Sequence, residues 1–327
     1  MRHLLTIALW ATTLGLPAQQ NTLNIKDIHI RDPFVYADAK TKTYYLYSSM
    51  DTIVNGKRHG GVVVYSSKDL TTWSLPKRVY TASAENWSAG RVWAPELHRY
   101  KGRYYLFLTL NSDITWKAQQ PNWPAYTMRC VQVMKGDKPD GTFREMSHMP
   151  TTPTDEMALD GTLYVENKQP YMVYCNEWVQ RVDGTMRIAP LSKDLSHFTK
   201  SPVDLFSASA APWSIGDKPE DGTPQSYVTD GPFIWKTSGG DLLMIWSSFM
   251  YGNYALGVAR SVTGSILGPW KQQEEPLFKE DGGHGMIFKT FDNRLLLVLH
   301  SPNTSGLERA TFHELIDDGH MLRIKNR

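Results

Sequence analysis

Cysteine is scarce in this 327-residue sequence, which contains only Cys130 and Cys175. Two cysteines cannot make a disulfide framework, and no C-x-x-C pair is present as a zinc motif. A single bridge between the two and a pair of buried free thiols both remain open.

Neither sign of charge is in excess, since 35 Lys and Arg accompany 33 Asp and Glu with a net charge of +2. This balance gives no support to a nucleic-acid groove or to an anionic membrane surface as partner.

Long helical patterns and linkers are also missing. No long amphipathic helix can be traced, which argues against a TIM barrel. No charge block, low-complexity tract or interdomain linker interrupts the chain after its first twenty residues. Disorder is excluded because 41% of the residues are hydrophobic. Residues 20–327 are therefore predicted to form a single domain, and no stretch in them is apolar enough to span a bilayer.

The first nineteen residues have the pattern of a secretory signal peptide. A short basic start at Arg2 precedes an apolar run over residues 4–16, and a small-residue end follows at 16–19. The run is shorter than the roughly 20 apolar residues that a membrane helix needs. We predict that residues 1–19 are removed and that the mature protein is periplasmic or secreted, with no membrane insertion.

Aromatic residues make up 12% of the chain and recur in a repeated pattern. Five segments each open with a short apolar strand, pass through a turn and return in a second, aromatic-rich strand. Third strands such as 61–67 and 254–261 follow, and fourth strands end units at 72–73 and 268–270. Four short strands per unit are typical of a propeller blade. The sequence therefore predicts an all-β fold, a five-bladed β-propeller, whose segments open at Asp32, Trp93, Asp160, Asp230 and His284.

The innermost strands of a propeller converge on its axis, so the five opening residues are expected to meet at one end. Three of them are carboxylates, Asp32, Asp160 and Asp230, and another is His284. Carboxylates gathered in a partly desolvated pit repel one another, so at least one pKa must be raised. A carboxyl of raised pKa that faces a carboxyl of ordinary pKa can split a glycosidic bond, one as acid and one as base. The alternative is that each Asp caps a turn or holds a cation, but three at equivalent positions favour catalysis.

The motifs of the five segments occur in a fixed order. They read Asp32-Pro33-Phe34, Trp93-Ala94-Pro95-Glu96, the Asp160 segment, Asp230-Gly231-Pro232-Phe233 and Gly283-His284-Gly285. This ordered set resembles the serial motifs of family 43 of the glycoside hydrolases over essentially the whole mature chain. The resemblance implies a five-bladed propeller and inverting hydrolysis, usually of arabinofuranosides, xylosides or related pentose and furanose linkages. We predict exo-acting removal of terminal pentose or furanose residues from plant-type polysaccharides or oligosaccharides. An α-L-arabinofuranosidase is the first choice, with β-xylosidase and galactofuranosidase as related activities.

The resemblance also assigns roles residue by residue. Asp32 matches the general base that activates water, and Asp160 matches the carboxylate that orients the acid and tunes its pKa. His284 matches an axial histidine that in many members helps to hold a calcium ion, whereas no organic cofactor is implied. The family usually has its proton donor as the glutamate of a Glu-Gly-Pro motif, but this sequence has Asp230 there. The donor is thus either Asp230, with a shorter side chain, or Glu177 in the third unit.

Aromatic side chains are predicted to contact the sugar. Phe34, Trp93 and Trp178 are the candidates for the pocket itself, and Trp213 is predicted to lie on a lid formed by the loop before the fourth unit. The loop over residues 111–124 would rim the pocket and favour exo cutting. A carbohydrate is the predicted partner, and the protein is expected to be a monomer. The rival interpretation is a propeller that binds sugar without cleaving it, its donor lost through the change from Glu to Asp.

Overall fold

The computed structural model describes residues 22–83, 85–88, 90–118, 122–216 and 224–325. The predicted signal peptide, residues 1–19, lies outside these ranges. Within the described ranges no helix is both long and apolar enough to cross a membrane.

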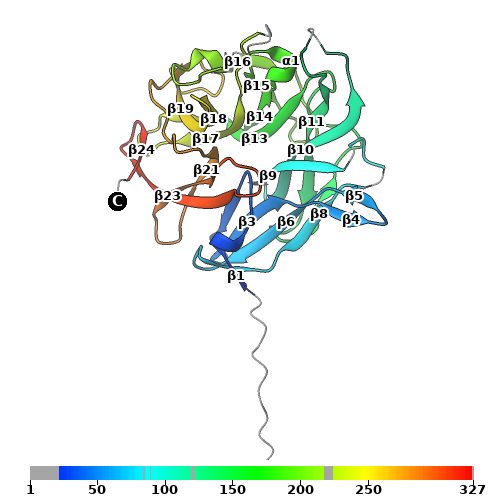
Figure 1. The fold of residues 1–327 in the computed structure, drawn as a ribbon. Helices are drawn as coiled ribbons and strands as arrows, with labels where there is room; N and C mark the ends of the chain where they lie inside the picture. The colour runs from blue at the N-terminus through cyan, green and yellow to red at the C-terminus, as the bar shows by residue number, and fades with distance from the viewer. Residues whose placement is uncertain (1–21, 84, 89, 119–121, 217–223, 326–327) are drawn as a thin grey trace, which may run out of the picture.

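Five antiparallel sheets surround a central axis like the blades of a propeller (Figure 1), which confirms the predicted fold. In blades 2 to 5 the four strands pair in chain order, and the first strands of neighbouring blades contact one another. Blade 2 contains β9 (Arg91–Tyr100), β10 (Arg103–Thr115), β11 (Thr127–Gly136) and β12 (Arg144–Glu145). Blade 3 contains β13 (Ala158–Glu166), β14 (Gln169–Asn176), β15 (Thr185–Pro190) and β16 (Val203–Ser207). Blade 4 contains β17 (Asp230–Lys236), β18 (Leu242–Met250), β19 (Asn253–Ser261) and β20 (Trp270–Gln272), and blade 5 contains β21 (Gly283–Lys289), β22 (Leu295–Ser301), β23 (Arg309–Asp317) and β24 (Leu322–Ile324).

Blade 1 departs from this simple order. Its inner strands are β2 (Phe34–Asp38), β3 (Thr43–Ser49) and β6 (Gly61–Ser67), and β6 then pairs with both β7 (Thr72–Ser74) and β8 (Lys77–Thr81). The first strand of the chain, β1 (Thr22–Asn24), adds to the outer edge of β7. A separate hairpin, β4 (Thr52–Val54) and β5 (Lys57–His59), is inserted between β3 and β6. Helical structure in the described ranges is limited to η1 (Ile25–Asp27), α1 (Trp178–Arg181) and η2 (Ala208–Ala210).

The hairpins between strands end in tight turns that the local sequence favours. Lys101 and Gly102 both have positive φ, 48° and 78°, between β9 and β10, and Tyr251 and Gly252 repeat this pattern between β18 and β19. Two consecutive left-handed residues match the right-handed twist of the flanking strands, which is why such turns connect hairpins. The strands they join are buried on both faces because each sheet is covered by its neighbours. In β14, for example, the last five residues, 172–176, are all buried.

The ring closes where blade 1 meets blade 5. The Ile30 N–H donates to the Glu308 carbonyl at 3.2 Å, and His29 pairs with Arg309 as an isolated bridge. One hydrophobic cluster spans this junction, with Val35 from blade 1 packed in the same core as Phe288 from blade 5. Closure therefore rests on apolar packing of the inner strands, with a few hydrogen bonds at the rim.

The inner strands share a backbone irregularity that places the site. In blades 2 to 5 the first strand loses register with the second at a bulge. One residue there has a positive φ, as does the residue two positions before β2 in blade 1. The next residue is Pro or Gly in each case, and the five residues are Asp32, Ala94, Asp160, Gly231 and His284. Bulges of this kind re-aim side chains at barrel and propeller rims. The predicted equivalence of the five openings is therefore wrong by one residue at Trp93 and Asp230, which precede the left-handed position.

The cysteines are both buried and free. Cys130 lies on β11 and Cys175 on β14, in neighbouring blades. Of the two alternatives left open by the sequence, the structure has the pair of buried thiols.

Candidate active site

A pocket of about 690 Å³ lies at the axis, at the end where the bulged inner strands converge. Residues from all five blades line it: His29, Arg31, Asp32, Ser49, Asp51, Val92, Trp93, Leu159, Asp160, Glu177, Asp230, His284, Ser305 and Glu308. The structure thus brings six of the predicted site residues into one pocket: Asp32, Trp93, Asp160, Glu177, Asp230 and His284.

Asp32 is held as a carboxylate. Its Oδ1 lies 3.2 Å from His284 Nδ1 and 3.7 Å from Arg31 Nε. Burial opposes ionisation, but the neighbouring His284, His300 and Arg31 outweigh it and lower the pKa of Asp32. An ionised carboxyl in a pocket is the state that a general base requires.

His284 is the cation between the acids. Its backbone N–H donates to Ser247 Oγ at 2.8 Å, and its Nδ1 lies 3.7 Å from Asp160 Oδ2 as well as near Asp32. Burial alone would lower the pKa of His284, but the carboxylates around it raise the pKa above its ordinary value. The raised pKa favours the protonated imidazole, and its charge and that of ionised Asp32 stabilise each other in a site of low dielectric.

Asp160 is the most buried of the three aspartates Asp32, Asp160 and Asp230, with 5% exposure. Its N–H donates to Thr109 Oγ1 at 2.9 Å, and its Oδ2 accepts the Gly231 N–H at 3.0 Å. Burial and the negative charges of Asp230 and Asp32 raise its pKa to about 7. Burial raises the pKa of Asp230 as well.

Asp230 is the first residue of β17 and has a neutral hydrogen-bond partner. The Tyr254 hydroxyl donates to Asp230 Oδ2 at 3.0 Å. Burial raises the pKa of Asp230, while His284 and the Tyr254 hydrogen bond partly oppose this rise. Tyr254, on β19, is fully buried, so its hydroxyl has a fixed position behind the carboxyl.

Glu177 differs from Asp230 in having a cationic partner. It is the residue before α1, and its Oε2 forms a partly buried ion pair with Arg129 Nη1. The same guanidinium lies over the Trp93 ring, 4.3 Å from its centroid. Burial raises the pKa of Glu177, and the charge of Arg129 opposes this rise. Glu177, Arg129 and Trp93 therefore form one wall of the pocket.

Of the aromatic residues predicted for the pocket itself, Trp93 lines it and Phe34 and Trp178 do not. Trp93 is 39% exposed and lines the pocket. Phe34 is buried against His98 and Phe233 beneath the site, and Trp178 packs edge-on against Trp123; neither is among the residues that line the pocket.

The prediction that Trp213 forms a lid is wrong. Its side chain is only 2% exposed and packs on Trp246, with ring centroids 4.8 Å apart. A Cβ at Gly257 would come within 2.1 Å of the Trp213 ring, so the glycine makes room for it. Trp213 is therefore a core residue of blade 4. Its indole ring is buried because removing so large an apolar surface from water is favourable.

The predicted calcium site at His284 can be tested against the donor set. Calcium takes six to eight oxygen ligands, whereas His284 Nδ1 is engaged by carboxylates, and no group of three His, Cys, Asp or Glu side chains in the described ranges is arranged to hold a metal ion. The side chains present do not form a cage for calcium. Calcium at this position stays a prediction, and the chemistry below is derived from the side chains alone.

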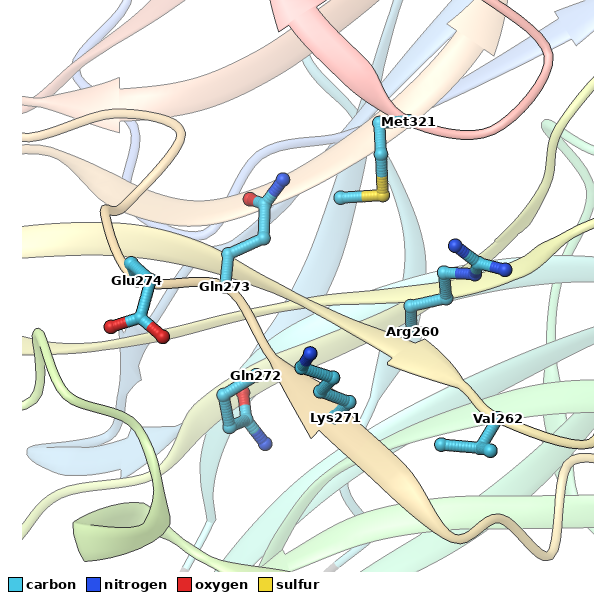
Figure 2. Close-up of a pocket in the computed structure, with 7 residues that line it drawn as sticks. All are labelled: Arg260, Val262, Lys271, Gln272, Gln273, Glu274 and Met321. Carbon is cyan, nitrogen blue, oxygen red and sulfur yellow. The ribbon is translucent and has the colours of Figure 1, made fainter.

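A second pocket, of about 420 Å³, lies away from the axis on the outer part of blade 4 (Figure 2). Figure 2 shows Arg260, Lys271 and Glu274 around it, with Met321 reaching in from the segment before β24. Its one acidic lining residue, Glu274, faces no second carboxyl there. The arrangement for acid–base chemistry is therefore in the axial pocket.

Sequence reasoning missed three residues that define the site: Arg129, Tyr254 and His300. Each lies inside an ordinary-looking strand, β11, β19 and β22, and no local motif marks it. The one available signal was a polar side chain within an apolar run, as in Leu299-His300-Ser301, because a buried polar group must have a partner.

Comparisons with known proteins agree with this geometry. The sequence model described as "Glycosyl hydrolases family 43" matches residues 25–318. The solved structure of an endo-arabinase from Bacteroides thetaiotaomicron VPI-5482 is similar with a TM-score of 0.80 and 35% sequence identity, covering 93% of this chain and 100% of that chain. An extracellular exo-α-(1→5)-L-arabinofuranosidase of Cellvibrio japonicus is 21% identical over 322 residues, 89% of this chain and 84% of that protein. An α-L-arabinofuranosidase of Humicola insolens is 26% identical over 196 residues, and the match spans 58% of this chain and only 37% of that protein.

Proposed function

This chain belongs to glycosyl hydrolase family 43 and is a glycoside hydrolase, and on that premise we propose that it is an exo-acting α-L-arabinofuranosidase that inverts the anomeric centre. The observation that carries the proposal is the axial pocket, in which an ionised Asp32 faces carboxyls of raised pKa. Inverting glycosidases need one carboxylate to activate water and one carboxylic acid to protonate the leaving group. Relatives named as extracellular arabinofuranosidases support both the sugar and a secreted location.

The exo mode is supported by the shape of the pocket. Walls come from every blade, with Ser49 and Asp51 on one side, Trp93 and Glu177 on another, and Ser305 in blade 5. A pocket lined by residues from every blade favours binding of a chain end over the middle of a polysaccharide. Endo cutting of arabinan is the second candidate, because the relative at 35% identity is described as an endo-arabinase.

In the proposed mechanism Asp32 is the general base. It takes a proton from the water that attacks the anomeric carbon, while His284 and Arg31 hold it ionised until that moment. Base catalysis of this kind contributes about 10²–10⁴-fold to the rate.

Asp230 is the proton donor in this proposal. Burial and the negative charge of Asp32 raise the pKa of Asp230, and its hydrogen-bond partner Tyr254 is neutral, which favours Asp230 as the carboxyl that carries the proton. Burial raises the pKa of Glu177 too, but Glu177 is paired with Arg129, and an adjacent cation favours its ionised form. Asp160 orients the donor and tunes its pKa in this proposal, and Glu177 with Arg129 fixes Trp93 against the sugar.

The test is product analysis on two kinds of substrate. Nitrophenyl glycosides of arabinofuranose, xylose and galactofuranose identify the sugar, and linear arabino-oligosaccharides identify the mode of cutting. Arabinose as the only first product from oligosaccharides supports the proposal. Shorter oligosaccharides as first products establish endo cutting, release from the xyloside or galactofuranoside alone overturns the sugar assignment, and sugar binding without turnover leaves the binding-only interpretation.

A further inference from the structure

His300 is a fully buried polar residue directly behind the proposed base. It lies on β22, the second strand of blade 5, and its side chain has 0% exposure. Its Nδ1 accepts the backbone N–H of Asp32 at 3.2 Å. No other hydrogen bond described for the Asp32 N–H competes with this one.

The hydrogen bonds determine the protonation state of the ring. A backbone N–H can only donate, so His300 Nδ1 must offer a lone pair and carry no proton. The proton of a neutral ring is then on Nε2, which lies 3.1 Å from Asn303 Oδ1 and donates to it. Burial lowers the pKa of His300, which also favours the neutral ring.

The bond from Asp32 matters because its backbone is strained. Asp32 has φ 52°, in the left-handed region that few residues other than glycine adopt, and such residues persist only where the surroundings hold them. The left-handed turn directs the carboxyl toward the axis. Because His300 Nδ1 accepts from the backbone, it donates nothing to the carboxylate, whose Oδ1 is 3.4 Å away and stays engaged with His284.

The ring face of His300 connects it, through Tyr254, to the proposed acid Asp230. The ring stacks on Tyr254, with centroids 5.5 Å apart and 19° between the planes, and the Tyr254 hydroxyl donates to Asp230. Gly283 allows this stack, since a Cβ there would come within 2.5 Å of the Tyr254 ring. Asp281 ties the two segments together by accepting the N–H groups of Tyr254 and Asn303.

We propose that His300, as the neutral Nε2–H tautomer, is a positioning residue that holds the strained backbone of Asp32 and, through its stack on Tyr254, sets the base in place relative to Asp230. The inference rests on Asp32 acting as the base. It makes His300 necessary for turnover although the ring touches no substrate.

Two substitutions distinguish the role of Nδ1 from the role of Nε2. In His300→Asn the amide oxygen can take the place of Nδ1 and accept from Asp32, but the contact with Asn303 is lost. In His300→Gln the amide nitrogen can take the place of Nε2 and donate to Asn303, but Asp32 loses its acceptor. Asn leaves the larger cavity, so His300→Asn is expected to be the less stable variant.

The variant expected to be less stable, His300→Asn, is expected to be the more active one. His300→Gln should lower kcat by about 10²-fold with KM nearly unchanged, because a small misplacement of a reacting group costs about that much. His300→Asn should keep kcat within about 10-fold of the wild type. Equal losses in both variants, or a larger loss in His300→Asn, would overturn the proposal, since activity would then follow packing alone.

A measurement without turnover keeps this inference separate from the proposed function. Long-range ¹H–¹⁵N spectra of the histidine rings, with His300 identified by its absence in His300→Gln, report which ring nitrogen carries the proton. A proton on Nε2 near neutral pH supports the proposal, and a proton on Nδ1 overturns it. If the wild type cleaves no glycoside, the proposed function fails while the tautomer still tests the role of His300.

Discussion

Replacing Tyr254 by Phe would show which carboxyl donates the proton. The Tyr254 hydroxyl donates to Asp230 Oδ2 at 3.0 Å and stabilises the ionised form, so it lowers the pKa of that carboxyl. Phe keeps the ring, and with it the stack on His300, while removing only the hydroxyl. The change is therefore confined to one hydrogen bond behind the proposed donor.

The size of the effect follows from the strength of that bond. A hydrogen bond to a charged group is worth about 1.5–3 kcal/mol, and one pKa unit corresponds to about 1.4 kcal/mol. Loss of the Tyr254 bond should thus raise the apparent pKa of Asp230 by about 1–2 units. A donor must be protonated to act, so the basic limb of the activity profile should move to higher pH by the same amount.

The assay is the pH dependence of kcat/KM on an arabino-oligosaccharide, which reports pKa values of the free enzyme. Arg129→Gln is the matched control, because it removes the cation beside Glu177 and raises the pKa of that carboxyl instead. Arg129 also lies over Trp93, so Arg129→Gln can lower the overall activity. The readout is therefore the pH at which the basic limb of the profile falls, and not the maximum value of kcat/KM. With Asp230 as donor, Tyr254→Phe moves the basic limb and Arg129→Gln leaves it in place.

The opposite pattern would refute this reasoning. A basic limb that moves in Arg129→Gln and stays in Tyr254→Phe would identify Glu177 as the donor. A limb that moves in neither variant would exclude both carboxyls.

Four further outcomes are expected. Asp32→Asn should lower kcat by about 10³-fold or more while the melting temperature changes little, and near-normal turnover would contradict its role as base. Proton NMR of the first-formed product should show the inverted anomer, and a retained configuration would rule out the water-activating mechanism. Trp213→Ala should lower the free energy of unfolding by about 3–5 kcal/mol, measured by denaturant titration, because its ring is buried on Trp246. Trp93→Ala, the comparison for Trp213→Ala, should instead raise KM and leave stability nearly unchanged, and loss of stability there would mean that Trp93 serves packing.

The donor question shows where sequence reasoning reached its limit. Asp230 and Glu177 were both identifiable, one from its motif and one from its place at the end of a strand. The side chains that distinguish them, Tyr254 and Arg129, come from different strands, 24 residues after Asp230 and 48 before Glu177. Spacing within one segment cannot reveal such partners, because they meet only when the strands pair and the blades pack.

Trp213 illustrates a related limit. Its segment, Ala211-Pro212-Trp213, is turn-rich, and by sequence alone it is indistinguishable from an exposed loop. The structure buries it because Gly257, on β19, leaves space for the ring. Burial of a loop residue depends on the shape of the surface it meets, and that shape has no local signature.

By itself, the sequence determined the number of blades, the order of the strands in most of them and the convergence of Asp32, Asp160, Asp230 and His284, because hydrophobic periodicity and turn residues act over a few neighbouring positions. Tertiary structure alone decided the rest. The left-handed bulges that aim these side chains appear only as the strands pair, while the ion pair of Arg129 with Glu177 and the contact of His300 with Asp32 join residues 48 and 268 positions apart. Charges and lone pairs act over a few ångströms in space, so the protonation states of the site exist only once the ring has closed.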